Sequence, residues 1–261
     1  MQQKSDQVRA LVRGLRVLKF INTRGETKAA EIAQALEIPR SSVYRLLQTL
    51  EEEGYIIYSS MDARVRVTSI AAGLGDNANR LLICQAAGAI LNRFTEEHSW
   101  PIDLSVYEDA HMLIKETTHP RSTLSIDRGM TGFSMPMLRT SAGRAYLSSC
   151  SCSEREHILN LVRNLHMPED LPFLQPNKLK EIKLQFKKYG YSTRSSRVFR
   201  QKTASIAVPV IYDGRVYGCI AIIWLNELLT LKEAIRRYSH PLLQTADQIT
   251  QQLHLLATQK T

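Results

Sequence analysis

The sequence predicts an α+β protein with an N-terminal winged helix-turn-helix domain, a linker helix and a C-terminal α+β domain built on an antiparallel sheet. Residues 27–50 contain two short amphipathic helical patterns with a proline between them. Residues 70–97 are rich in Ala and Leu and carry few strand signals. Two β-rich runs meet at Asp213-Gly214, a strong signal for a hairpin. We therefore expect domains at residues 1–68 and 99–261, joined by a helix at 69–98.

The first expected element is a helix from Val8 to Asn22, whose apolar residues include Leu11, Leu15, Leu18 and Ile21. Thr27 is suited to cap the next helix. That helix has an apolar stripe at i, i+3, i+4 and i+7: Ala29, Ile32, Ala33 and Leu36. Pro39 then favours a turn followed by a new helix, because the residue before a proline avoids the α region. The new helix carries its own stripe: Val43, Leu46, Leu47 and Leu50.

The face of this second helix opposite its apolar stripe has side chains that suit DNA. Arg and Gln can bond to base edges in the major groove, and Ser and Tyr can hold phosphates. Between Ile38 and Leu50 the sequence has no acidic residue. Any pair of short amphipathic helices can give a similar pattern, but a hairpin follows directly here. The pattern therefore predicts a helix-turn-helix whose second helix reads DNA.

The hairpin consists of the runs Tyr55–Tyr58 and Arg64–Val67 around a turn-like segment. Alternation places Arg64 and Arg66 on one face of this wing, within reach of phosphates. The residues expected at the DNA are Thr27, Arg40, Ser41, Ser42, Tyr44, Arg45, Gln48, Arg64 and Arg66.

The C-terminal domain mixes strand and helix patterns. The expected strands are Ile102–Tyr107, His111–Thr118, Leu124–Ile126, Ser205–Tyr212 and Arg215–Trp224. The expected helices are one from Thr140, one from a capping box at Ser153–Glu156, Lys178–Tyr189 before Gly190, and Leu231–Leu256 with an interruption near Pro241. Such an order is typical of an antiparallel α+β domain.

The composition excludes several classes of protein. The net charge is +9, but residues 1–66 hold 11 Lys and Arg against 8 Asp and Glu, so charge alone supports a nucleic-acid partner only weakly. No apolar run approaches the ~18 residues of a membrane span, and the polar start lacks a signal-peptide core, so we expect a cytoplasmic protein without a membrane partner. Four cysteines predict buried, reduced thiols. Cys150-Ser151-Cys152 lacks a second ligand pair, so no metal site is expected.

No catalytic set or cofactor motif is found. The chain lacks a P-loop, a dinucleotide fingerprint, G-x-S-x-G and H-E-x-x-H. His119 is expected to be structural. A DNA reader joined to a large domain without catalytic residues predicts a ligand-responsive regulator that is not an enzyme. The alternatives are an architectural DNA-binding protein and an enzyme with a site hidden in the C-terminal domain.

Several segments resemble the IclR-type transcriptional regulators, and the resemblance covers nearly the whole chain. It is carried by Arg13-Gly14-Leu15, Ser41–Leu47, Gly54-Tyr55, Thr140–Ala145 and Ile206–Val210. Trp100–Asp103, Glu116–His119 and Ala204–Pro209 look closest to the subgroup that activates catabolism of 3-(3-hydroxyphenyl)propionate. In one respect the chain departs from many relatives, because residues 197–202 are basic where the relatives carry acids.

The resemblance implies an effector-binding C-terminal domain whose curved antiparallel sheet holds a small organic acid. It also implies homodimers or homotetramers on double-stranded operator DNA, and RNA polymerase is a further candidate partner. The family's pocket corresponds here to Met130, Met137, Thr140, Ala142, Cys219 and Ala221. Methionines suit an aromatic ring, and arginine can grip a carboxylate bidentately. We therefore expect an aromatic acid held by Arg128 first and Arg200 second.

Overall fold

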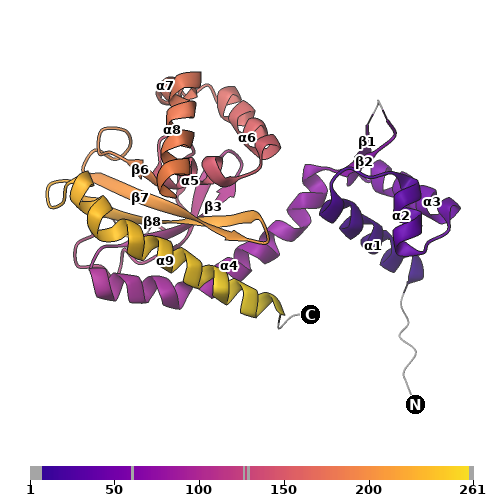
Figure 1. Cartoon of the computed structure of the whole chain (residues 1–261), viewed down its shortest axis with the longest axis horizontal. Helices are drawn as coiled ribbons and strands as arrows, with labels where there is room; N and C mark the ends of the chain where they lie inside the picture. The colour runs from indigo at the N-terminus through magenta and orange to yellow at the C-terminus, as the bar shows by residue number, and fades with distance from the viewer. Residues whose placement is uncertain (1–7, 60–61, 126, 128–129, 259–261) are drawn as a thin grey trace, which may run out of the picture. The chain divides into compact units, whose positions relative to one another are not determined.

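The computed structural model describes residues 8–59, 62–125, 127 and 130–258 (Figure 1). The chain divides into two compact units, residues 1–78 and 79–261. Helix α4 (Ser69–His98) spans the boundary between them. Among the described residues, no helix is long and apolar enough to cross a membrane.

The N-terminal unit is a winged helix-turn-helix, as predicted. Its elements are α1 (Arg9–Arg24), α2 (Ala29–Leu36), α3 (Arg40–Glu52), β1 (Ile56–Tyr58) and β2 (Val65–Val67). β1 and β2 are antiparallel, and Thr27 forms an isolated bridge to Val65 at the edge of this hairpin. The three helices and the hairpin share one core, which includes Ile21, Ile32, Val43, Leu47, Ile56 and Val65.

In α1, Leu11 and Leu15 are 61% and 57% exposed, whereas Val17 and Ile21 are fully buried. One expectation for this unit is wrong in detail. The N-cap of α2 is Lys28 and not Thr27. The hydroxyl of Thr27 instead donates to the carboxylate of Glu31 at 2.7 Å, and this bond is the main cause that lowers the pKa of Glu31.

The C-terminal unit is built on a six-stranded antiparallel sheet in the order β5-β4-β3-β8-β7-β6. The strands are β3 (Ile102–Glu108), β4 (His111–Thr117), β5 (Ser134–Pro136), β6 (Ser192–Arg194), β7 (Thr203–Tyr212) and β8 (Arg215–Leu225). The helices after α4 are α5 (Ser141–Ser149), α6 (Cys152–Asn164), α7 (Leu171–Leu174), α8 (Pro176–Tyr189) and α9 (Leu231–Thr258), with a 3-10 turn at Pro168–Asp170.

Helices cover both faces of this sheet (Figure 1). The second half of α4 and α9 pack on one face, over a core that includes Leu104, Ile206, Ile220 and Trp224. α5 and α6 pack on the other, over a core that includes Met112, Ala207 and Cys219. Alternating residues of β7 and β8 therefore serve two hydrophobic layers, as expected for a strand buried on both sides.

The β7–β8 hairpin is confirmed. Asp213 and Gly214 both have positive φ, of 50° and 70°, the backbone that a two-residue I′ turn requires. α8 also ends as predicted, because Gly190 adopts the left-handed conformation and its N–H bonds to the carbonyl of Phe186.

Other boundaries differ from the prediction. Leu124 lies in a turn and Ser125 outside any strand, while Ile126 lies outside the described residues. α6 begins two residues earlier than expected, since the hydroxyl of Ser151 accepts from the N–H of Glu154. α9 continues through Pro241. A proline removes one helical hydrogen bond, and the buried residues Ala234, Leu242 and Ala246 hold the turns on either side against the sheet. Cys152 is exposed, although a buried thiol was expected.

Candidate DNA interface and ligand pocket

The exposed face of α3 is the candidate DNA interface. Val43 and Leu47 are fully buried and pack α3 against the core of the N-terminal unit. The same amphipathic pattern turns Arg40, Ser41, Tyr44, Arg45 and Gln48 to solvent, and Ser42 is half-buried. Among the described residues, neither Arg40 nor Arg45 has an ion-pair partner, so both charges are available to phosphates or base edges.

The wing supplies a second cationic patch, but its arginines are already engaged. Arg64 Nε lies 2.7 Å from Asp62 Oδ2, and Arg66 Nη1 lies 3.8 Å from Glu26 Oε1. Both arginines remain 39% or more exposed, so these surface pairs are weak and can exchange for phosphate. Thr27 is different. Its side chain is 1% exposed and bonded to Glu31, so the expected DNA contact of Thr27 is wrong for this structure.

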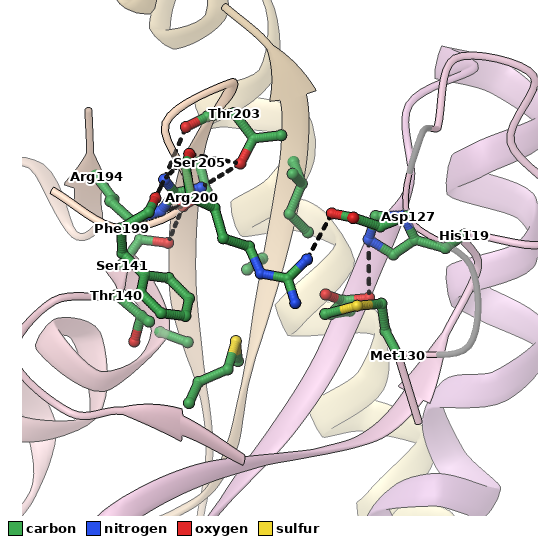
Figure 2. Close-up of a pocket in the computed structure, with 15 residues that line it drawn as sticks. His119, Asp127, Met130, Thr140, Ser141, Arg194, Phe199, Arg200, Thr203 and Ser205 are labelled. Carbon is green, nitrogen blue, oxygen red and sulfur yellow. Dashed lines mark hydrogen bonds and ion pairs between the residues drawn. The ribbon is translucent and has the colours of Figure 1, made fainter. Parts of the chain in front are cut away.

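The C-terminal unit contains a hollow that opens to solvent (Figure 2); together with the open solvent at its mouth, the empty space amounts to about 440 Å³. It lies between the first turn of α5, the β7–β8 pair, the segment after β6 and the segment after β4. Its walls are formed by Asp103, His119, Asp127, Met130, Met135, Thr140, Ser141, Ala142, Arg194, Phe199, Arg200, Thr203, Ser205, Ala221 and Ile223.

Five of the predicted effector residues line this hollow together: Met130, Thr140, Ala142, Arg200 and Ala221. Met137 and Cys219 do not line it; both side chains are buried, at 1% and 0% exposure. Arg128 lies outside the described residues.

One wall is cationic, and sequence reasoning missed its main residue. Arg194 extends from β6 and is 4% exposed. Its Nε donates to Ser205 Oγ at 3.2 Å, Nη1 to the carbonyl of Thr203 at 2.7 Å, and Nη2 to Thr203 Oγ1 at 3.0 Å. Ser205 Oγ in turn lies 2.7 Å from Ser141 Oγ at the start of α5. Burial lowers the pKa of Arg194 to about 10; the positive charges of Arg144 and Arg200 lower it further, and the negative charge of Asp127 raises it.

A second arginine, Arg200, reaches across the hollow (Figure 2). Its Nη1 lies 2.7 Å from Asp127 Oδ2, and its guanidinium lies 4.8 Å from the centre of the Phe133 ring. The backbone of Arg200 has a φ of 53°, which is uncommon outside glycine. Arg200 therefore lines the hollow with its charge already paired to a carboxylate.

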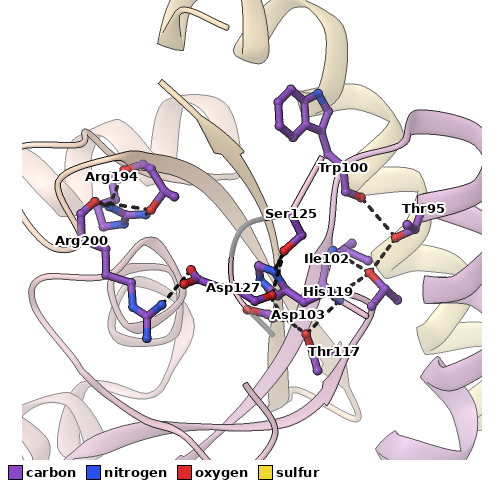
Figure 3. Close-up of polar contacts among 12 residues, drawn as sticks. Thr95, Trp100, Ile102, Asp103, Thr117, His119, Ser125, Asp127, Arg194 and Arg200 are labelled. Carbon is purple, nitrogen blue, oxygen red and sulfur yellow. Dashed lines mark hydrogen bonds and ion pairs between the residues drawn. The ribbon is translucent and has the colours of Figure 1, made fainter. Parts of the chain in front are cut away.

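The opposite wall holds a buried network around His119 (Figure 3). Nδ1 of His119 lies 2.5 Å from Ser125 Oγ, and Nε2 lies 3.7 Å from Asp103 Oδ1. Thr117 Oγ1 donates to the same Asp103 oxygen at 2.6 Å, and Ser125 Oγ donates to the carbonyl of Asp127 at 2.8 Å.

These residues have the composition of a Ser-His-Asp triad but not its bonding. The single hydroxyl proton of Ser125 is given to the carbonyl of Asp127, so His119 Nδ1 must be the donor in their contact. A nucleophilic serine requires the reverse, with a histidine that accepts the hydroxyl proton. The separation of 3.7 Å between His119 and Asp103 also exceeds a hydrogen bond. The geometry thus favours the structural role expected for His119.

Comparison with known proteins shows which family this chain matches. The model of the IclR helix-turn-helix domain matches residues 10–59, and that of the bacterial transcriptional regulator IclR C-terminal domain matches residues 75–251. The acetate operon repressor of Salmonella typhimurium is 27% identical over 193 residues, which cover 71% of this chain and 69% of the repressor.

Solved structures share the fold. The IclR protein of Thermotoga maritima aligns with a TM-score of 0.58 and 20% identity over 95% of this chain and 99% of that one. An IclR homologue from Microbacterium hydrocarbonoxydans, complexed with 4-hydroxybenzoate, aligns with a TM-score of 0.55 and 20% identity over 94% of this chain and 99% of that one.

Proposed function

Since this chain belongs to the IclR family of bacterial transcriptional regulators, we propose that it binds operator DNA through α3 and that an aromatic acid in the C-terminal hollow changes this binding. It would act in the cytoplasm as a homodimer or homotetramer, without a cofactor. The observation that carries the proposal is the combination, in one chain, of two features. Arg40 and Arg45 on the exposed face of α3 form no ion pair with any residue that the structure describes, and the C-terminal hollow has a buried arginine in its wall.

For the DNA, the proposal assigns different roles to the arginines of α3. Arg45 lies one and a half turns into the helix, opposite the buried Val43 and Leu47. It is placed to meet base edges when α3 enters the major groove. Arg40 is the first residue of α3, at the end of the helix that would lie near the DNA backbone. It would hold phosphate together with Ser41, Ser42 and Tyr44. Gln48 is bonded to Glu52 at 3.0 Å and would have to exchange that partner for a base.

For the effector, the wall chemistry favours a ring with a carboxylate. Met130, Met135, Ala221 and Ile223 provide apolar surface that suits an aromatic ring. The first turn of α5, which includes Ser141 and Ala142, also lines the hollow. The N–H groups of a first helical turn attract anions, although in α5 the N–H of Gly143 is already bonded to Thr140 Oγ1.

Two further points support an aromatic acid. The homologue complexed with 4-hydroxybenzoate holds such a molecule. The sequence resemblance to the activators of 3-(3-hydroxyphenyl)propionate catabolism suggests a phenylpropanoid member of the class. RNA polymerase stays a candidate partner.

Two other functions fit less well. A hydrolase would need an activated serine, and the proton of Ser125 is directed away from His119. An architectural DNA-binding protein would need no hollow with a buried charge in a unit larger than its DNA reader. The regulator is therefore the function that uses both units.

We expect the operator to contain two half-sites. One reader helix covers only a few base pairs, and symmetric oligomers match repeated or palindromic sites. DNA selected by the protein from a random pool should show two half-sites when footprinted, with centres about 10 base pairs or a multiple apart. Scrambling one half-site should weaken binding more than about tenfold. A protein that sediments on DNA as a monomer and protects one half-site would contradict this expectation.

A further inference from the structure

Arg194 has a buried charge that forms no ion pair with a carboxylate in the part of the chain that the structure describes. Its side chain is 4% exposed, and every acceptor of its hydrogen bonds is a neutral oxygen of a carbonyl or hydroxyl. Among the described residues, no carboxylate lies within ion-pair distance of its guanidinium. The carboxylates of Asp127 and Asp170 are bonded to Arg200 and Arg139 instead. With a pKa of about 10, set mainly by burial, the group remains charged at neutral pH.

Such an arrangement is costly for the folded protein. Removing a charged group from water is unfavourable unless an opposite charge or a metal compensates it. We propose that Arg194 is the charge partner of an anionic effector, so that the missing counter-charge is the carboxylate of the ligand. The proposal deepens the function above, because it rests on the effector occupying this hollow.

The bonding of Arg194 leaves room for such a ligand. A guanidinium has five N–H groups. Nη2 carries two of them, and its one bond among the described residues goes to Thr203 Oγ1. One N–H of a group that lines the hollow is therefore available. The hydroxyls of Ser141 and Ser205, which lie 2.7 Å apart, provide a second donor beside it. A carboxylate placed there would receive a charge-assisted bond and a hydroxyl bond.

Arg200 is a poorer candidate for the same role. Asp127 already neutralises it at 2.7 Å, so an incoming carboxylate would have to displace an existing anion. Arg194 requires no such exchange. The two arginines can therefore be separated by experiment: removing Arg194 should abolish the preference for an anionic ligand, and removing Arg200 should not.

The test uses the full chain and calorimetry with benzoate, phenylacetate and 3-phenylpropionate, each beside its neutral amide. We expect the wild type to bind at least one of the acids about tenfold or more tightly than its amide. Arg194→Gln should bring this ratio close to one and change the affinity for the amide far less. Arg194→Lys should keep part of the ratio, because it keeps the charge but not the planar fork. Arg197→Gln is the matched control, an exposed arginine of the same segment that does not line the hollow, and should keep the full ratio.

Damage to the fold would weaken the binding of the acid and of its amide alike. A change in the ratio of their affinities therefore reports the loss of the charge contact and not a damaged fold. If Arg194→Gln does not fold, Arg200→Gln decides, because the preference for the acid must then persist. If Arg194→Gln keeps the full preference for the acid over its amide, or if Arg200→Gln loses it, the proposed role of Arg194 is overturned. The proposal that the effector binds in the hollow would still stand. Equal binding of acids and amides by the wild type would have the same two consequences. If no compound of the series binds, the proposed effector class fails and Arg194 loses its ligand with it.

Discussion

Replacing Gly143 by alanine is expected to lower the free energy of unfolding of the C-terminal unit by about 3 kcal/mol or more. A Cβ at this position would lie 2.1 Å from the carbonyl oxygen of Met137 and 2.6 Å from its carbonyl carbon. These are backbone atoms, so no side-chain rotation can relieve the overlap. α5 would have to move away from the segment after β5, and Thr140, Ser141 and Ala142 would move with the wall of the hollow.

Tryptophan fluorescence measures this effect in the full chain, because both tryptophans, Trp100 and Trp224, are buried in the C-terminal unit. Urea unfolding followed at this signal should show a lower midpoint for Gly143→Ala. Gly88→Ala is the control: Gly88 lies in α4, and its added Cβ meets nothing within 4 Å. Alanine favours a helix over glycine by up to about 1 kcal/mol, so the unfolding midpoint of Gly88→Ala should equal or exceed that of the wild type. Equal midpoints for Gly143→Ala and the wild type would show that α5 does not need the close approach.

Replacing Arg45 by alanine is expected to cost about 1–3 kcal/mol of operator binding for each reader helix and to relax the preference at one base pair per half-site. The reason is the position of Arg45 on the exposed face of α3, without an ion-pair partner among the residues that the structure describes. Arg40→Ala is the matched comparison, an exposed arginine of the same helix at its first residue. It should weaken operator and scrambled DNA alike and make the salt dependence shallower.

Fluorescence anisotropy with operator and scrambled duplexes, at several salt concentrations, measures both variants. The assignment of roles would be wrong if Arg45→Ala discriminated between the two duplexes as well as the wild type does. It would equally be wrong if Arg40→Ala lost discrimination and kept its salt slope.

Local patterns predicted much of this molecule because local forces determine those parts. The stripe of Val43 and Leu47, the proline before α3 and the Asp213-Gly214 turn each depend on a few adjacent residues. For the ligand wall, the two-residue period of β8 places Cys219, Ala221 and Ile223 on one face. The family resemblance placed Cys219 in the wall, but in the structure it packs in the cluster that includes Ala142 of α5 and does not line the hollow.

The remaining features depend on contacts between distant segments. β6 has only three residues, Ser192–Arg194, and its pairing with β7 buries Arg194. A basic stretch that includes Arg197 and Arg200 gives no sign of which arginine becomes buried. The pairing of Arg200 with Asp127 joins residues 73 positions apart. Thr27 was expected at the DNA, but its bond to Glu31 and its bridge to Val65 bury it.

Whether this chain is an effector-responsive regulator can be measured as the affinity of the full chain for its selected operator, with and without saturating aromatic acid. A coupling free energy of about 1–3 kcal/mol between the two sites is typical of an allosteric protein. The dissociation constant for the operator should therefore change by about fivefold or more, in either direction, with the acid and not with its amide. An operator affinity that stays the same while the acid is shown to occupy the hollow would contradict the claim that this chain is an effector-responsive regulator.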